Sequence, residues 1–248
     1  MPYRYKPKSN CLLSKLPPAD LKRLEVHLEP AELPLGHVVY EAGEKLTHVY
    51  FPTTAIISLL YETQTGESSE VAIAGKHGLV GVSTYLGDDC TVGRAVVQCA
   101  GHGLKIPAAR LKKEFNTGGP LQDLMLRYVQ AFITQISQSA VCNRLHSVSQ
   151  RLCRWLLVNH DQLPGDRLSM THDMIAHMLG VRREGVTIAA GHLQEIGAIK
   201  YSRGTLMILD RKKLEKAACE CYEVVAGEFD RLLGPLPRKK SKNNGSSK

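Results

Sequence analysis

Short runs of β-branched and aromatic residues, separated by glycine or proline, occupy the first half of the chain. Five such runs fall at residues 37–40, 49–51, 56–61, 71–73 and 94–99. Between about residues 31 and 107 glycine or proline interrupts them repeatedly, and Gly101 and Gly103 follow the last run. Many short strands at regular intervals predict a β-sandwich or barrel-like roll. Residues 17–20 start a small helix ahead of it.

The pattern becomes helical from residue 120 to about 141, without internal glycine or proline. Pro120 can begin this helix, because the first turn does not need its N–H group. Two apolar stripes follow it, one of Leu121, Leu124 or Met125, Tyr128, Phe132, Ile136 and Ala140, the other of Leu126, Val129 and Ile133. One stripe can cover the roll, and the other needs a partner. A second copy of the helix would supply it through a parallel coiled-coil-like contact. Burial of both stripes within one chain is the alternative.

Closely spaced helices and a hairpin follow towards the C-terminus. Residues 150–160 predict a helix, residues 161–166 a loop, and residues 171–193 a helix-turn-helix. Gly180 suits the tight turn of this motif, because glycine tolerates the left-handed backbone conformation. The positions that would face inward are small or apolar: Ile175, Ala176, Leu179, Val181, Val186 and Ala189. Residues 199–208 predict a β-hairpin, which would form a wing.

Polar and charged residues face outward at the start of the second helix of the motif. Arg182, Arg183, Glu184 and Thr187 can reach base edges and phosphates in a DNA major groove. An ordinary helical hairpin, in which Gly180 is only a C-cap, is the alternative interpretation. The cluster favours DNA binding, because a recognition helix approaches DNA through its N-terminal residues.

The composition is ordinary for a soluble protein, except for an excess of basic residues. The chain has 248 residues, 43% hydrophobic and 23% charged, and no apolar run approaches the roughly 20 residues of a membrane span. The N-terminus lacks the apolar core of a signal peptide, so we expect the chain to stay in the cytoplasm. The net charge of +8 suits a polyanionic partner. Five of the excess charges lie in the tail, at Arg238, Lys239, Lys240, Lys242 and Lys248. We expect this tail to be disordered, serving either DNA affinity or solubility.

The seven cysteines and ten histidines are scattered along the chain. An odd number of cysteines argues against a disulfide framework, and no C-x-x-C occurs. Cys219 and Cys221 are two residues apart, which on a helix points their thiols in different directions. His172 and His177 are five apart and do not share a helical face in the way of an i, i+4 pair. We therefore expect no clustered ligand set for zinc or an iron–sulfur centre, and interpret the cysteines as small buried apolar residues.

The order of parts is a Gly-rich roll, a long helix and a winged helix-turn-helix. The most specific segments are V-Y-F-P-T-T-A-I-I-S-L-L at residues 49–60, G-L-V-G at residues 78–81 and I-A-H-M-L-G-V-R-R-E at residues 175–184. From about Leu13 to Val225 the chain resembles the catabolite-activator (Crp/Fnr) family of bacterial transcription regulators. The resemblance implies a homodimer on a palindromic, double-stranded DNA operator, with RNA polymerase as a further partner and no membrane association.

The expected fold is of the α+β class, with four parts. Residues 1–118 form a cyclic-nucleotide-binding-like β-roll (a double-stranded jelly-roll) that acts as sensor. Residues 119–146 form the dimerisation helix and hinge, residues 147–227 the winged helix-turn-helix domain, and residues 228–248 the basic tail.

The resemblance also implies roles for the outward residues. In the family an Arg-Glu pair near the start of the recognition helix reads bases, and Arg183-Glu184 matches it, with Arg183 suited to guanine and Glu184 to cytosine. The other expected DNA-binding residues are Arg182, Thr187, Thr171 and, at the tip of the wing, Arg203. A further basic residue usually follows one turn on, where this chain has Ile188, so we expect an operator that departs from the family's commonest half-site.

The sensor half departs from the family's cyclic AMP pattern. Members that bind cyclic AMP have Gly-Glu-x in a turn and an Arg-Ser pair further on. Here the turn is Gly81-Val82-Ser83, and Arg94 is shifted by one residue, which turns a side chain to the opposite face of a strand. Each lost hydrogen-bonding partner costs about 1–3 kcal/mol, so we expect an effector other than cyclic AMP. The candidate pocket residues are Gly81, Val82, Ser83, Arg94 and, on the long helix, Ser137.

Other effectors and other classes of protein stay open. Cys11 stands alone, so iron–sulfur sensing fails on ligand count, while His77 and Cys90 leave haem binding open. No nucleophile–base pair groups in the sequence, and Ser83 and His77, both near Gly-rich turns, are the only hints of one, so we expect no enzyme. We predict no cofactor and leave an unidentified small-molecule effector open. The alternatives are a cyclic-nucleotide- or haem-dependent regulator, or a ligand-binding module that docks a protein instead of DNA.

Overall fold

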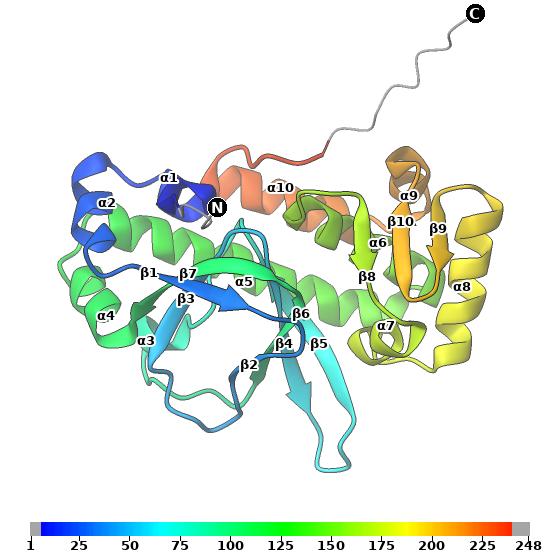
Figure 1. Cartoon of the computed structure of the whole chain (residues 1–248), viewed down its shortest axis with the longest axis horizontal. Coiled ribbons are helices and arrows are strands. Elements are labelled where there is room, and N and C mark those ends of the chain that lie inside the picture. Colours follow the sequence, from blue (N-terminus) through cyan, green and yellow to red (C-terminus); the bar gives the residue numbers. More distant parts are fainter. Residues whose placement is uncertain (1–5, 240–248) are drawn as a thin grey trace, which may run out of the picture.

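The computed structural model describes residues 6–239 as a β-roll, one long helix and a head of helices with a small sheet (Figure 1). The strands are β1 (Glu29–Leu33), β2 (Val38–Tyr40), β3 (His48–Pro52), β4 (Ile56–Glu62), β5 (Ser68–Ala74), β6 (Arg94–Cys99), β7 (Gly101–Pro107), β8 (Arg167–Ser169), β9 (Ile199–Ser202) and β10 (Thr205–Ile208). The helices are η1 (Pro7–Ser9), α1 (Cys11–Ser14), α2 (Pro18–Glu25), α3 (Ser83–Leu86), α4 (Ala108–Asn116), α5 (Pro120–Leu145), α6 (Val148–Gln162), α7 (His172–Leu179), α8 (Arg183–Glu195), α9 (Arg211–Ala217) and α10 (Cys221–Leu233). Over this range no helix is long and apolar enough to cross a lipid bilayer.

Two antiparallel sheets form the roll. Their strand orders are β1-β7-β3 and β2-β6-β4-β5. Side chains alternate between the two faces of a strand, so two consecutive residues of β4 enter different cores. Ile57 joins the core inside the roll with Leu33 and Val97, whereas Ile56 joins the core of the head. The outer face of the larger sheet is therefore part of the contact between roll and head.

The five strand runs expected from the sequence correspond to β2–β6. The expectation missed β7, the central strand of its sheet, because Gly101 and Gly103 resemble turn residues. They serve close backbone packing instead. A Cβ on Gly101 would lie 2.5 Å from the Ala55 nitrogen, and one on Gly103 would lie 2.9 Å from the Phe51 carbonyl oxygen. Only glycine fits at such approaches.

The long helix α5 begins at Pro120, as expected, and continues to Leu145. Its first stripe is buried at Leu121, Met125, Tyr128 and Phe132. The Tyr128 hydroxyl also donates a hydrogen bond to the Leu79 carbonyl oxygen (2.9 Å), which fastens the helix to the roll. Along the second stripe Leu126 is 46% exposed and Ile133 56% exposed. Burial of both stripes within one chain is therefore wrong for this structure.

Helix α10 runs back along α5 (Figure 1). Val225, Phe229 and Leu233 of α10 enter the same apolar core as the buried stripe of α5, and the Phe229 ring meets Tyr128 edge-on at 6.3 Å between centroids. The expected boundary between head and tail at residue 228 falls inside this helix, because its apolar face continues beyond that position.

The start of the expected tail is ordered against the rest of the chain. Leu236 is buried, Arg238 pairs with Asp230, and Lys239 pairs with Asp166 at 3.2 Å. Disorder is therefore wrong for residues 234–239, since apolar contact and ion pairs hold them. Lys240, Lys242 and Lys248 lie outside the described residues.

Candidate nucleic-acid interface

The predicted helix-turn-helix is formed by α7 and α8. The Thr171 side chain caps α7 by accepting a hydrogen bond from the Met174 N–H (3.2 Å). Gly180 ends α7 with φ 60° and ψ 46°, the left-handed conformation that glycine adopts without a Cβ penalty. Ile175, Ala176, Leu179, Val186 and Ala189 are buried, and Val181 packs against the same core. The tight turn and the inward face expected from the sequence are confirmed.

The outer face of α8 carries the residues expected to meet DNA. Arg182, Arg183, Glu184 and Thr187 are all exposed. The Arg183 Nε lies 3.6 Å from the Asp173 carboxylate, with both side chains more than 60% exposed, so this ion pair is weak and the guanidinium can leave it. One turn further on, Ile188 is 74% exposed and shares this outer face.

The Thr187 hydroxyl already has partners inside the head. It donates to the Arg183 carbonyl oxygen (3.1 Å) and lies 3.1 Å from Nδ1 of His172. The His172 ring stacks on Tyr201 of β9 at 4.2 Å between centroids. These contacts join the start of α7, the outer face of α8 and the wing. His172 therefore acts within the motif, as expected.

The wing is the hairpin of β9 and β10, which pair antiparallel as predicted. Arg203 lies exposed in its turn, with the positive φ of 48° that a tight two-residue turn requires. The Gly204 carbonyl oxygen accepts a hydrogen bond from the Met170 N–H (2.8 Å) just ahead of α7. The wing tip therefore lies close to the N-terminus of the helix-turn-helix.

The candidate pocket residues lie at three separate places, two in the roll and one on α5. Gly81 is buried against Val49. Val82 lies just before α3 and Ser83 begins that helix, and both are partly buried. Arg94 pairs with Glu41, at 2.9 Å between Nε and the carboxylate, and Ser137 is exposed on α5. A hollow on the roll is lined by other residues, namely Val39, Tyr40, Glu44, Lys45, Leu46, Thr47, His48 and Tyr50.

His77, one of the two open haem ligands, is committed to other contacts. Its Nδ1 lies 3.1 Å from the Gln162 amide, and its Nε2 lies 3.2 Å from the Pro237 carbonyl oxygen. Burial, followed by the charges of Lys76 and Arg238, lowers the pKa of His77 to about 3. The imidazole is therefore neutral and holds the C-terminal segment against the roll.

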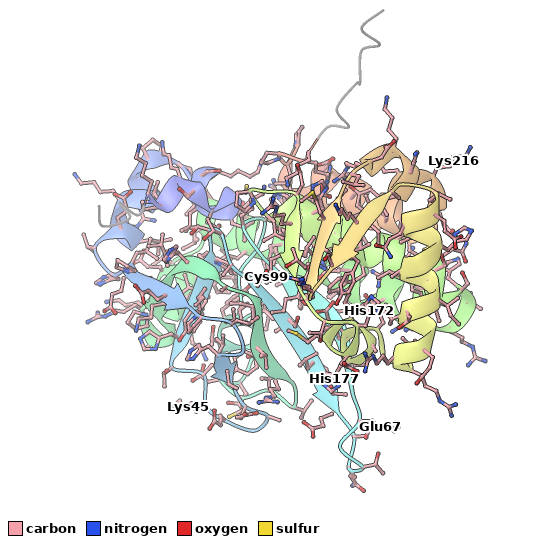
Figure 2. All side chains as sticks on the ribbon, turned by 45° about the vertical axis from the view of Figure 1, so that its right-hand side comes forward. Lys45, Glu67, Cys99, His172, His177 and Lys216 are labelled. Atoms are coloured by element: carbon pink, nitrogen blue, oxygen red, sulfur yellow. The ribbon has the colours of Figure 1, made fainter. Side chains whose placement is uncertain are left out.

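The head packs on the outer face of the roll, where His177 of α7 approaches the β4–β5 hairpin that ends near Glu67 (Figure 2). Glu70 of β5 lies in this junction. Its carboxylate accepts hydrogen bonds from the Ser58 hydroxyl (2.6 Å) and the Trp155 indole N–H (2.8 Å). Burial raises the pKa of Glu70 to about 7, although both hydrogen bonds favour the ionised form. A group that titrates near neutral pH therefore joins the two halves.

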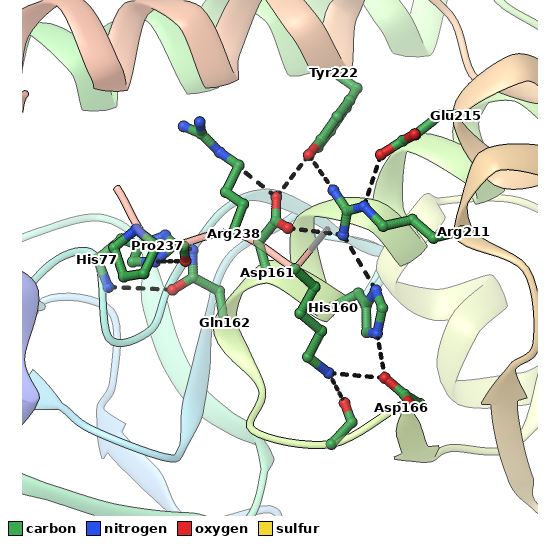
Figure 3. Close-up of polar contacts among 12 residues, drawn as sticks. His77, His160, Asp161, Gln162, Asp166, Arg211, Glu215, Tyr222, Pro237 and Arg238 are labelled. Carbon is green, nitrogen blue, oxygen red and sulfur yellow. Dashed lines mark hydrogen bonds and ion pairs between the residues drawn. The ribbon is translucent and has the colours of Figure 1, made fainter. Parts of the chain in front are cut away.

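A buried ionic network fixes the last helices to α6 (Figure 3). Arg211 of α9 pairs with Asp161 of α6 at 2.8 Å, and both side chains are at most 6% exposed. The Tyr222 hydroxyl donates to the same carboxylate (2.8 Å). His160 bridges Arg211 to Asp166, with 3.2 Å and 2.9 Å contacts. These bonds position α9 and α10 relative to the recognition motif.

The expectation that the thiols and imidazoles are not clustered is wrong. Cys142, His146, Cys219 and Cys221 offer one ligand atom each, and these atoms all lie within 4.8 Å of one another. Cys219 precedes α10 and is not in a helix, so the helical argument about Cys219 and Cys221 does not apply. The one signal in the sequence was Cys142 and His146, which are four apart at the end of the long helix.

Known proteins resemble this chain in its helix-turn-helix and over most of its length. The model of the Crp-like helix-turn-helix domain matches residues 150–217. The CRP-like cAMP-activated global transcriptional regulator of Mycobacterium tuberculosis is 20% identical over 208 residues, which cover 81% of this chain and 93% of that protein.

Two solved structures have a similar fold. A transcriptional regulator assigned to the Crp/Fnr family, from Eubacterium rectale, has a TM-score of 0.66 and 19% identity over 85% of this chain and 98% of its own. FixK2 from Bradyrhizobium japonicum has a TM-score of 0.66 and 13% identity over 77% of this chain and 98% of its own. The β-roll, long helix and C-terminal helix-turn-helix thus recur together in other proteins.

Proposed function

The chain belongs to the Crp/Fnr family of transcription regulators, and from this premise we propose that it reads a palindromic operator as a homodimer. The observation that carries the proposal is the exposed first turn of α8, which the Gly180 turn holds away from the core. The N-terminal residues of a recognition helix contact base edges in the major groove.

Within that turn each side chain has a distinct task. Arg183 donates to guanine O6 and N7, and Glu184 accepts from cytosine N4. Arg182 and Thr187 bind phosphates beside the groove, Thr171 does so from the start of α7, and Arg203 does so from the wing. Ile188, which is 74% exposed one turn further on, suits a thymine methyl group, so the half-site carries an A·T pair at that step.

The exposed stripe of α5 supports the homodimer. Leu126, Val129 and Ile133 recur at spacings of three and four, and Leu126 and Ile133 stay about half exposed. Two parallel copies of α5 would bury these side chains against each other. A two-fold-symmetric dimer then matches a palindrome, because each recognition helix meets one half-site. Contact with RNA polymerase follows from the family and completes the proposal.

The effector we propose is not cyclic AMP. Val82 provides no carboxylate for a ribose hydroxyl, and Arg94 is engaged with Glu41. Both positions would leave a cyclic nucleotide short of hydrogen bonds, at about 1–3 kcal/mol for each unmet group. DNA binding without added nucleotide is the expected behaviour.

The test is selection of bound sequences from random duplex DNA by the purified protein, with and without cyclic AMP. We expect a palindrome in both conditions. Enrichment only with cyclic AMP would overturn the effector proposal, and binding without sequence preference would favour a module that docks a protein.

Two variants distinguish a base contact by Arg183 from a general effect of positive charge. Arg183→Ala should weaken binding to the selected operator by about 5- to 150-fold, because a bidentate base contact contributes about 1–3 kcal/mol, with little effect on random DNA. Arg110→Ala removes the same charge from an exposed position on α4 of the roll and should leave sequence preference unchanged. Equal losses in both variants would contradict the assignment of Arg183.

A further inference from the structure

Four side chains with metal-binding atoms meet where the long helix ends and α10 begins. The Sγ atoms of Cys142 and Cys219 are 3.5 Å apart, and the Sγ of Cys221 lies 3.6 Å from Nδ1 of His146. Cys142, Cys219 and Cys221 are at most 5% exposed, and His146 is partly buried. This cluster takes no part in the proposed DNA interface.

Local structure turns all four groups inward. Cys142 lies in the last turn of α5, and His146 caps the C-terminus of that helix. The His146 N–H donates a hydrogen bond to the Cys142 carbonyl oxygen (3.1 Å), which holds the two residues together. Cys219 lies in the short connection between α9 and α10, and Cys221 is the first residue of α10. Because this connection is not helical, two thiols separated by one residue can face the same point.

The spacing suits a single tetrahedral ion. Zinc binds thiolate at about 2.3 Å and imidazole at about 2.0 Å, which places tetrahedral ligand atoms about 3.6–3.8 Å apart. The 3.5 Å and 3.6 Å separations are close to these values. Four protein ligands leave no open position for substrate, which is the arrangement of structural zinc sites.

Two charged side chains next to the cluster would support a bound ion. The Glu220 carboxylate lies 3.3 Å from Nε2 of His146, so that Nε2–H can donate to it while Nδ1 faces the thiols, the usual outer partner of a metal-bound histidine. Arg151 is 8% exposed, lies close enough to Cys142 for their charges to interact, and has no hydrogen-bond partner for its Nε among the described residues. Its positive charge would balance an anionic site.

We propose that Cys142, His146, Cys219 and Cys221 bind one Zn²⁺ ion, through the three Sγ atoms and Nδ1 of His146. Binding replaces three thiol protons, which pass to solvent, and the neutral imidazole keeps its Nε2 proton. The site then carries one net negative charge beside Arg151.

The ion would fix the hinge of the molecule. Cys142 and His146 lie just before the α5–α6 junction, and the other two ligands belong to the segment that follows the winged motif. Zinc therefore fastens the DNA-binding head to the end of the dimerisation helix. Its loss should loosen the head and weaken operator binding without removing any DNA-contacting residue.

The experiment uses the full chain purified in reducing, oxygen-free buffer without chelator. We expect one zinc per chain by atomic emission. After acid-chelator stripping, Zn²⁺ should rebind with release of about three protons at neutral pH. Co²⁺ in place of zinc should give the visible bands of tetrahedral cobalt and a thiolate charge-transfer band. A wild-type chain that takes up neither metal, or that carries a Cys142–Cys219 disulfide without oxygen, would overturn the proposal.

Variants locate the site and keep the test independent of folding failure. Cys219→Ser and His146→Ala should each hold less than half an equivalent of zinc, and Glu220→Gln should weaken zinc affinity by about 10-fold. Cys153→Ser, a fully buried cysteine of α6 outside the cluster, should keep one equivalent. Full zinc content in Cys219→Ser would refute the ligand assignment, whatever the stability of the variants.

Discussion

At the scale of single residues, a carboxyl group with a raised pKa lies in the junction between roll and head. Glu70 receives hydrogen bonds from Ser58 and Trp155, and Arg154 and Cys99 are the other titratable groups that interact with it. Its pKa of about 7 lies above the usual value near 4.3. The folded state therefore binds this proton more tightly than the unfolded chain does. The resulting stabilisation is fully present below about pH 4 and is lost as the pH rises through 7.

The first prediction is that Glu70→Gln abolishes the loss of stability that the wild type shows as the pH rises through 7. In the wild type the group's contribution to the free energy of unfolding should fall by an amount on the order of 2–3 kcal/mol between pH 5 and 8. The variant should lack that decline, which urea unfolding across the range would measure. Glu67→Gln, at the exposed end of the same hairpin, should behave as the wild type does. An unchanged pH slope in Glu70→Gln would contradict the assignment.

At the scale of elements, the recognition motif depends on the backbone conformation of one turn. Gly180 has a φ of 60°, whereas Gly191 lies within α8 with open space around its Cβ position. The same substitution should therefore act in opposite directions at the two glycines. Gly180→Ala should lower the free energy of unfolding by about 1 kcal/mol, and Gly191→Ala should raise it by about 0.5–1 kcal/mol. Thermal or urea unfolding of both variants would check this, and equal signs would refute it.

The exposed stripe of α5 gives a second prediction at this scale. Ile133→Glu places a charge in the proposed subunit contact and should raise the dimer dissociation constant by about 100-fold or more, because the charge would lose its hydration. Gln138→Glu adds the same charge to the flank of α5, away from the stripe. Sedimentation should find mostly monomer in the first variant and dimer in the second. A dimer that tolerates Ile133→Glu would place the contact elsewhere.

At the scale of the whole molecule, distant segments are joined by a few buried polar contacts. Arg211 and Asp161 pair at 2.8 Å with little exposure, so Arg211→Met would leave the buried carboxylate with only a more distant ionic partner, the Arg238 Nε at 3.8 Å. We expect a loss of about 3 kcal/mol in the free energy of unfolding, the lower end of the cost of breaking a buried pair, measured by urea unfolding. Arg231→Met removes an exposed pair with Glu228 on α10 and should have no measurable effect. Similar losses of stability in the two variants would contradict the larger contribution that we assign to the buried pair.

The sequence by itself determined the local elements and the recognition motif. Strands β2–β6, the start of α5 at Pro120 and the turn at Gly180 follow from residue spacing and backbone preference, which act over a few neighbouring positions. The exposed turn from Arg182 to Thr187 is equally local, since the apolar face of the same helix fixes which side chains point outward.

Only the tertiary structure decided which distant residues meet. The sequence indicates a turn at Gly103, but in the structure this glycine lies in β7 against the backbone of β3. No local sequence pattern distinguishes a glycine in a turn from a glycine at such a close approach. Cys142 and Cys219 are 77 positions apart, so their meeting depends on how α10 returns along α5. The pKa of Glu70 likewise depends on a head that covers it. Such contacts arise from long-range packing, which cannot be predicted from composition or periodicity.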